Sequence, residues 1–298
     1  MTPLERRYRR LLRAYPHDYR SAYGDELLDV LLESASPLRT VPEPREAAGL
    51  VIGGLRERLT RAGRGSSWAN GVHLGVTALC VAQLAALLPY APAIPLWTLL
   101  SALALLAVLR GRVRLALPLV LLTGAKAVAV ASGEPLFDHL LLPVEPGFLT
   151  DAPLFALSEP PPVATDYALA LGGLLVLAVY GRPLTPRSWW WWAAVPPMAW
   201  AGPAWMESGT VYPISLSRMA VELALLGMAL WAGRLSHDPR WALGATIYVT
   251  VASARLWDHA ADLTRQHLAY WGLLVFLAGA TALVPFGHWR RASTPRLD

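Results

Sequence analysis

Two opposite charges stand inside a stretch of sequence that otherwise has the composition of a membrane-spanning helix. Residues 214–233 read ISLSRMAVELALLGMALWAG, with Arg218 and Glu222 four positions apart. At that spacing both side chains project from one face of a helix and can neutralise one another. A charge at mid-bilayer costs ~2.5 to well over 10 kcal/mol, so such residues face a bundle interior or a wet cavity. The pair predicts either an ion pair that joins helices or part of a binding site.

Two further cations, Lys126 and Arg255, lie in other apolar stretches. At about 1.5 Å per helical residue, all four charges fall in the outer half of the expected bilayer. If they also meet laterally, three cations and one anion line an outward-facing pocket for an anionic or zwitterionic ligand, such as a lipid headgroup or a small acid. The alternatives are a local ion pair with Lys126 snorkelling to the interface, and a proton relay through Glu222.

A second group of polar residues resembles a metal site in composition. The pattern aromatic-Asp-His occurs twice, at 137–139 and 257–259. Histidine and carboxylate can hold zinc with an open position for water, which would suit an outward-facing metal-dependent membrane enzyme. The spacing matches no HExxH or other established signature, so we predict ordinary polar residues at an outer surface, without metal or cofactor. They are Asp138, His139, Asp258, His259, Asp262 and His267.

The elements that carry these residues are predicted from composition. Of 298 residues, 55% are hydrophobic and only 16% are charged, against about 25% charged in an ordinary soluble domain. The apolar residues gather in blocks about 20 long, the length that crosses roughly 30 Å of hydrocarbon. Runs such as GGLLVLAVY do not alternate as the strands of a membrane barrel do. The chain is therefore predicted to be an all-α polytopic membrane protein.

Loop charges predict the orientation of eight spans. Segments on one side, which include both termini, hold 22 of the 26 basic residues, and 25 of the 26 are arginine. Arginine-rich short loops stay in the cytoplasm, so we predict a bacterial plasma-membrane protein with both termini in the cytoplasm. The same loops explain the basic pI of 9.6 without binding to nucleic acid. The predicted spans are 68–88, 92–109, 113–132, 164–181, 189–206, 214–233, 241–257 and 268–286. We expect a prefix at 1–67, a membrane domain at 68–288 with an outer loop at 133–163, and a tail at 289–298.

The prefix is predicted to fold as three short helices. Apolar residues recur at helical spacing in PLERRYRRLLRAY, in the segment after Pro16, and in REAAGLVIGGLRERL. Helices this short are marginal alone, so their apolar stripes must pack on one another, on the membrane surface or on a partner. The residues predicted to dock a partner are Tyr8, Leu11, Tyr19, Tyr23 and Leu27.

The prefix also resembles a known kind of sequence. YRRLLRAYPHDYRSAYGDELLDVLLESA, followed by PREAAGLVIGGLRERL, looks like a helical prefix common in actinobacterial membrane proteins. Similar prefixes precede some permeases, and others sit on multispan proteins that are often encoded beside PadR-type transcriptional regulators. The resemblance covers about the first fifth of the chain, and it implies a cytoplasmic docking or regulatory prefix and no reaction.

These observations order the functional hypotheses. The first is a non-enzymatic sensor, regulatory anchor or permease-like subunit whose prefix docks a cytoplasmic regulator or an ATPase. The chain contains no GxxxxGK[ST] motif, so an ATPase of the usual kind would be the partner. The second is a small transporter or a lipid- or anion-binding protein with an outward-facing charged pocket, and the third is the metal-dependent enzyme. The single cysteine, Cys80, excludes an internal disulfide.

Overall fold

The computed structural model describes residues 2–35, 39–62, 66–92, 94–133, 160–200, 214–258 and 260–292. Within these ranges the regular elements are all helices. The chain separates into two compact units, Met1–Gly65 and Ser66–Asp298, so the division falls two residues before the predicted boundary. The prediction of an all-helical protein is confirmed for the described part of the chain.

The N-terminal unit consists of α1 (Pro3–Leu11), the 3-10 helix η1 (Leu12–Ala14), α2 (His17–Glu33) and α3 (Pro44–Ala62). A capping box starts α1, because the Thr2 hydroxyl accepts from the Glu5 N–H and the Glu5 carboxylate accepts from the Thr2 N–H. The chain is extended at Tyr15, as expected for the residue before a proline. The unit has its own hydrophobic core, made of Leu4, Tyr8, Leu12, Leu28 and Leu50.

Gly54 lets α3 pack tightly on η1. A Cβ at Gly54 would lie 2.7 Å from the Cβ and the carbonyl carbon of Ala14, so a larger residue would push the helices apart. One turn later, Arg58 donates hydrogen bonds to the carbonyls of Ala14 at 2.5 Å and Arg13 at 2.6 Å. The end of η1 is thereby tied to α3, which fixes the turn that carries the chain from α1 into α2.

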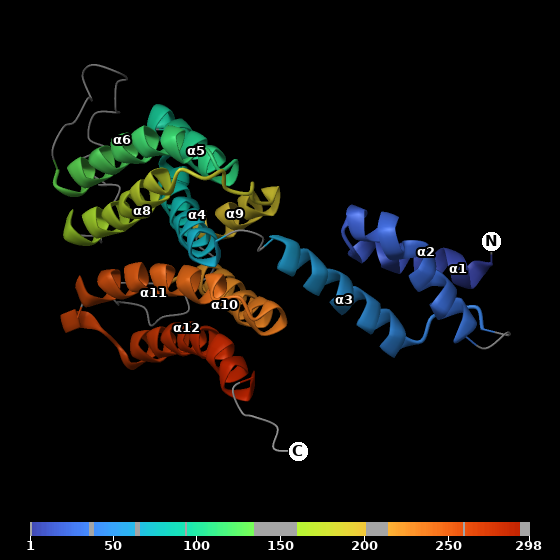
Figure 1. Cartoon of the computed structure of the whole chain (residues 1–298). Coiled ribbons are helices and arrows are strands. Elements are labelled where there is room, and N and C mark those ends of the chain that lie inside the picture. Colours follow the sequence, from blue (N-terminus) through green and yellow to red (C-terminus); the bar gives the residue numbers. More distant parts are fainter. Residues whose placement is uncertain are drawn as a thin grey trace. The chain divides into compact units, whose positions relative to one another are not determined.

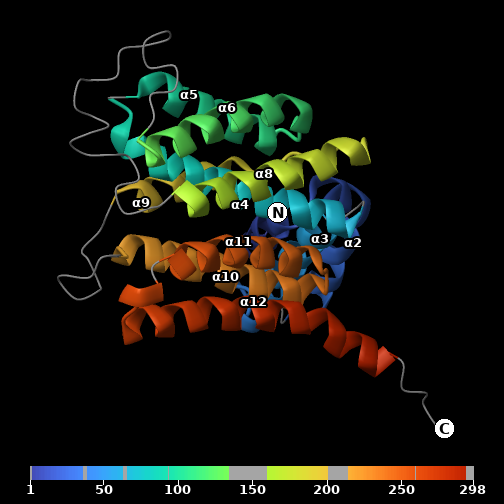
Figure 2. The ribbon, with the colours of Figure 1, turned by 90° about the vertical axis from the view of Figure 1, so that its left-hand side faces the viewer.

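The second unit is a helical bundle (Figures 1 and 2). Its elements are α4 (Ser67–Leu87), η2 (Leu88–Tyr90), α5 (Pro95–Leu109), α6 (Val113–Ala131), α8 (Pro160–Tyr180), η3 (Trp189–Ala194), α9 (Val195–Ala199), α10 (Leu216–Ser236), α11 (Arg240–Asp258), η4 (Ala260–Asp262) and α12 (Arg265–Ala292). Among the described residues, five helical segments are long and apolar enough to cross a membrane: Ser67–Tyr90, Val113–Ala131, Pro160–Tyr180, Leu216–Ser236 and Arg265–Val284. These five helices indicate a membrane protein.

Helix α4 is the centre of this bundle and packs on α5, α8, α9 and α11. Figure 2 shows α5, α6 and α8 on one side of it and α10, α11 and α12 on the other. The contact between α4 and α11 is close because glycines line both helices. A Cβ at Gly75 would lie 2.8 Å from Ile247, and a Cβ at Gly244 would lie 2.8 Å from Leu74. Small residues of this kind let membrane helices approach each other closely.

The predicted span 189–206 is described only in part. That part is the 3-10 helix η3 followed by α9, which ends at Ala199. Residues 201–206 of the predicted span lie outside the described residues. Pro196 and Pro197 stand in the first turn of α9, where a missing N–H costs no internal hydrogen bond.

Candidate functional site

The predicted ion pair, Arg218 and Glu222, lies at a junction of three helices. Arg218 and Glu222 are both on α10, and the Arg218 Nε donates to Glu222 Oε1 at 2.9 Å. The Tyr248 hydroxyl of α11 donates to the same oxygen at 2.7 Å, and the Tyr270 hydroxyl of α12 donates to Oε2. Both oxygens of the Glu222 carboxylate therefore accept hydrogen bonds, from donors on every helix of the junction. We call these four residues the Glu222 node.

The local sequence positions the Glu222 node. The Ser215 hydroxyl accepts from the Arg218 N–H and caps α10 one turn before the pair. Around the node, Ile214, Leu226, Val249 and Leu274 form a small apolar core, and Glu222 is only 1% exposed. A carboxylate at this depth is stable only when it is paired and hydrogen-bonded. The arrangement matches the interpretation of the pair as an ion pair that joins helices.

Of the other two predicted members of an outer pocket, Lys126 can be placed, and it lies on a helix outside the Glu222 node. Lys126 lies on α6, which packs on α5 and α8. It is 3% exposed, and its ammonium lies 5.8 Å from the ring centroid of Trp97. Among the described residues, Arg218, Tyr248 and Tyr270 donate hydrogen bonds to the Glu222 carboxylate, and Lys126 is not one of these donors. The side chain of Arg255 lies outside the described residues.

The structure also shows a buried charge that the sequence prediction missed. Asp166 of α8 is 2% exposed, and its Oδ1 accepts from the Gln83 amide of α4 at 3.3 Å. It lies inside the predicted span 164–181, so the carboxylate among apolar residues was the signal that could have found it. Asp166 follows the same rule as Glu222, because its buried carboxylate is met by a donor from another helix.

The structure describes two of the predicted outer polar residues, His267 and Asp262, and their surroundings differ. His267 is fully buried at the start of α12. The imidazole Nδ1 accepts from the backbone N–H of Thr264 at 3.2 Å and contacts the Thr264 hydroxyl at 2.8 Å. The backbone N–H of His267 donates to that hydroxyl at 3.4 Å. This reciprocal arrangement caps the helix in the manner of a capping box. Asp262 is exposed in η4.

The remaining members of that group, Asp138, His139 and His259, and the side chain of Asp258, lie outside the described residues. In the part of the chain that is described, no three His, Cys, Asp or Glu residues are grouped so that they could hold a metal ion.

Several segments predicted to be cytoplasmic meet at one end of the bundle. The Arg187 N–H donates to the Leu109 carbonyl at 2.7 Å, and its guanidinium donates to the Asn70 carbonyl at 2.6 Å. A Cβ at Gly71 would lie 3.0 Å from the backbone of Arg240. Burial, together with the smaller effect of nearby Arg240, lowers the pKa of the Arg187 guanidinium to about 10. Arg187 thus ties the loop before η3 to the ends of α4 and α5.

The N-terminal unit contains a second carboxylate that is held by a tyrosine and an arginine. The Tyr8 hydroxyl donates to Glu46 Oε2 at 2.8 Å, and Arg39 pairs with Glu46 Oε1 at 3.3 Å. Desolvation raises the pKa of Tyr8 to about 12, and the hydrogen bond to Glu46 adds to the shift. The Tyr8 hydrogen bond and the Glu43 N–H lower the pKa of Glu46. We call Tyr8, Arg39 and Glu46 the Glu46 node.

The predicted docking residues divide between the core and the surface of this unit. Tyr8 is fully buried, and Leu11 and Leu27 are half-buried against the same core. Tyr19 is also half-buried, whereas Tyr23 is exposed; their rings pack 5.2 Å apart, and Tyr15 stacks on Tyr19 at 5.0 Å. Tyr23 is 52% exposed. Of the five residues predicted to dock a partner, Tyr23 alone is exposed.

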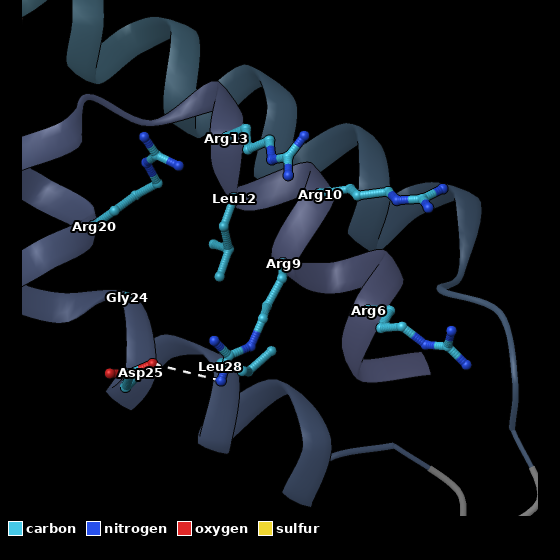
Figure 3. Close-up of a pocket in the computed structure, with 9 residues that line it drawn as sticks. All are labelled: Arg6, Arg9, Arg10, Leu12, Arg13, Arg20, Gly24, Asp25 and Leu28. Atoms are coloured by element: carbon cyan, nitrogen blue, oxygen red, sulfur yellow. Dashed lines mark ion pairs between the residues drawn. The ribbon is translucent and has the colours of Figure 1, made fainter. Parts of the chain in front are cut away.

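A cavity of about 400 Å³ lies between α1, η1 and α2 of the N-terminal unit (Figure 3). Five arginines and one aspartate line it over a floor of two buried leucines, and the sequence prediction did not identify it. The spacing of four of the arginines at i, i+3, i+4 and i+7 was a signal for one basic helical face. The lining residues are Arg6, Arg9, Arg10, Leu12, Arg13, Arg20, Gly24, Asp25 and Leu28. We call this site the arginine cavity.

No protein-family model, curated protein or solved structure matches this chain. The functional assignment therefore depends on the fold and on the geometry of these sites.

Proposed function

We propose that this chain is an eight-span membrane protein, with both termini in the cytoplasm, whose N-terminal unit docks a soluble partner protein. The observation that supports docking is that the first 65 residues form a compact unit with its own core, while Tyr23 is exposed beside the half-buried Tyr19. A unit that is folded by its own contacts is free to present a surface. The resemblance to prefixes of membrane proteins found beside transcriptional regulators favours a regulatory partner.

The bundle supports a structural role for its buried charges. Glu222 already accepts hydrogen bonds from Arg218, Tyr248 and Tyr270, so its carboxylate serves to hold helices together. In this proposal the bundle anchors the docking unit at the membrane. The predicted cytoplasmic segments that meet around Arg187 are consistent with a single cytoplasmic end.

Co-purification from native membranes tests the docking proposal. We expect a soluble protein to co-purify with the full-length chain and to be absent when residues 2–65 are removed. The double variant Tyr19→Ala, Tyr23→Ala should weaken the association, whereas Ile52→Ala, which removes another exposed apolar side chain of the same unit, should not. Rebuilding the complex from the two purified proteins would establish direct contact. An identical set of proteins with and without residues 2–65 would contradict docking.

Cysteine labelling in intact cells tests the orientation. In a Cys80→Ala background, we would place single cysteines at Ala261 and at Arg182, which are both exposed. A membrane-impermeant maleimide should label the cysteine at 261 in intact cells and the cysteine at 182 only after lysis. The reverse pattern would place the termini outside.

A further inference from the structure

Arginines outnumber acidic residues in the lining of the arginine cavity. Five arginine residues contribute to it, with Asp25 as the single acidic one. Arg9 is 3.9 Å from Asp25 and 3.4 Å from Glu5, and its side chain remains 51% exposed. Exposed pairs of this kind contribute little to stability, so Arg9 can exchange these partners for another anion at small cost. The excess of arginine over acidic residues in the lining favours an anion.

One buried donor in the cavity wall has no acceptor among the described residues. The Nε–H of Arg20 is buried and makes no hydrogen bond there, although Arg20 lines the cavity. Buried polar groups in folded proteins nearly always have a partner. An acceptor that enters the cavity from outside the unit would meet this requirement.

The volume and lining of the cavity limit the kind of molecule that can supply this acceptor. Its volume of about 400 Å³ lies in the range of small-molecule sites, roughly 300–1,000 Å³. Figure 3 shows Arg9 and Arg20 extending from α1 and α2 on either side of Leu12, while Arg6 and Arg10 extend away toward the outer side of α1. Leu12 and Leu28 are 5% and 3% exposed and give the cavity an apolar floor. The site combines charge at its walls with a hydrophobic surface beneath.

We infer that the arginine cavity binds a phosphate group that carries two or more negative charges. The planar guanidinium group matches phosphate oxygens in a bidentate geometry, and such charge-assisted hydrogen bonds are the strong ones. Arg9 and Arg20 would contact the phosphate, and the leucine floor would contact the organic part of an ester. The phosphate can belong to a soluble phosphate ester or to an anionic phospholipid. This choice of sources depends on the proposed cytoplasmic location of the unit.

Equilibrium dialysis of full-length protein in detergent with radiolabelled pyrophosphate tests the site. We expect saturable binding, and a loss of about tenfold or more in affinity for the double variant Arg9→Glu, Arg20→Glu, since two charge-assisted contacts are reversed. Arg7→Glu makes the same charge change at an exposed α1 position outside the cavity lining, and it should bind within about twofold of wild type. Absence of saturable binding, or equal losses in Arg7→Glu and the double variant, would overturn the inference.

A cavity-filling variant separates a built site from general attraction to basic charge. A Cβ at Gly24 would meet only the Arg20 Cβ, at 3.6 Å, so Gly24→Phe can occupy the cavity while every arginine is kept. It should abolish pyrophosphate binding. Gly49→Phe is the matched control on α3, because nothing lies within 4 Å of a Cβ there, and it should bind normally. Unchanged binding by Gly24→Phe would show that the cavity is not the site.

Nanodiscs distinguish the two sources of phosphate. If the natural ligand is a phospholipid, nanodiscs containing phosphatidic acid should weaken pyrophosphate binding relative to neutral phosphatidylcholine nanodiscs, and the Arg9→Glu, Arg20→Glu variant should not show this competition. If the ligand is soluble, both nanodiscs should give the same affinity. Displacement of pyrophosphate by an acidic peptide at lower concentration than by a phosphate ester would instead assign the cavity to protein docking. Partner docking is measured by co-purification, so either proposal can fail alone.

Discussion

Glu222 and Glu46 are held by the same chemistry in two different surroundings. Each carboxylate accepts a tyrosine hydroxyl and pairs with an arginine: Tyr248, Tyr270 and Arg218 in the bundle, and Tyr8 and Arg39 in the N-terminal unit. Glu222 is 1% exposed among apolar side chains, whereas the Glu46 side chain is 30% exposed. The two sites therefore pair similar groups at very different depths of burial.

The difference in burial predicts that the two nodes contribute differently to stability. Removing a partner from a buried charge leaves the charge without compensation from solvent, which costs several kcal/mol. Removing a partner from an exposed pair lets water replace it. The Glu222 node should consequently fix the packing of α10, α11 and α12, while the Glu46 node should contribute modestly to the fold of its unit.

The largest effect is expected for Glu222→Ala. The substitution removes the acceptor of three donors in a buried site, and we expect a loss of about 3 kcal/mol in the free energy of unfolding. In a bundle of this size that corresponds to a fall of roughly 6–12 °C in the unfolding temperature. The buried thiol of Cys80, the single cysteine, reports unfolding when it becomes accessible to a thiol-reactive dye.

Glu222→Gln provides the control for that measurement. The amide keeps an oxygen that can accept from the tyrosines but loses the charge that pairs with Arg218, so its effect should be smaller than that of Glu222→Ala. An unfolding temperature for Glu222→Ala equal to that of wild type would show that the node does not stabilise the bundle.

A smaller effect is expected at alkaline pH in the Glu46 node. The pKa of Tyr8 rises from 10.0 to about 12 on folding, so the folded unit holds this proton more tightly than the unfolded chain does. The resulting stabilisation is fully present below pH 10 and is lost as the pH rises to about 12. Absorbance of tyrosinate at about 295 nm, compared between wild type and Tyr8→Phe, should reveal one group that ionises near pH 12 in the folded protein. A difference curve centred at pH 10 would contradict the buried position of Tyr8.

The sequence predicted much of the bundle because apolar block length is a local property. The expected spans 113–132 and 241–257 end within one residue of α6 and α11. The same reasoning was less useful for 189–206, where the described part is a 3-10 helix and a short α-helix. A run of four tryptophans and two adjacent prolines are apolar enough for a span, but apolar composition alone does not ensure a continuous helix.

The sites were predicted only where their members are neighbours in sequence. The pairing of Arg218 with Glu222 follows from helical spacing, whereas Tyr248 and Tyr270 come from positions 26 and 48 residues further along the chain. Their partners depend on how α10, α11 and α12 pack, which no local pattern encodes. The arginine cavity is an intermediate case, because α1 supplies a recognisable basic face but Arg20 joins it only after the turn at Pro16.

The smallest effect is expected for Arg39→Ala, which is the exposed counterpart of Arg218→Ala. Arg39 pairs with Glu43 at 3.1 Å and Glu46 at 3.3 Å, with its side chain 31% exposed. Solvent can replace it at both carboxylates, so protection of α1 and α3 from hydrogen exchange should change little. Any difference should disappear at about 1 M salt, where charges are screened beyond about 3 Å.

Arg218→Ala should instead lower the unfolding temperature of the bundle, and salt should not remove the loss because its partner Glu222 is shielded from solvent ions. If Arg39→Ala proved as damaging as Arg218→Ala and equally insensitive to salt, exposure would not be what separates the two nodes. The Glu46 carboxylate would then have to be treated as part of the core of its unit, held by Arg39 as firmly as Glu222 is held by Arg218.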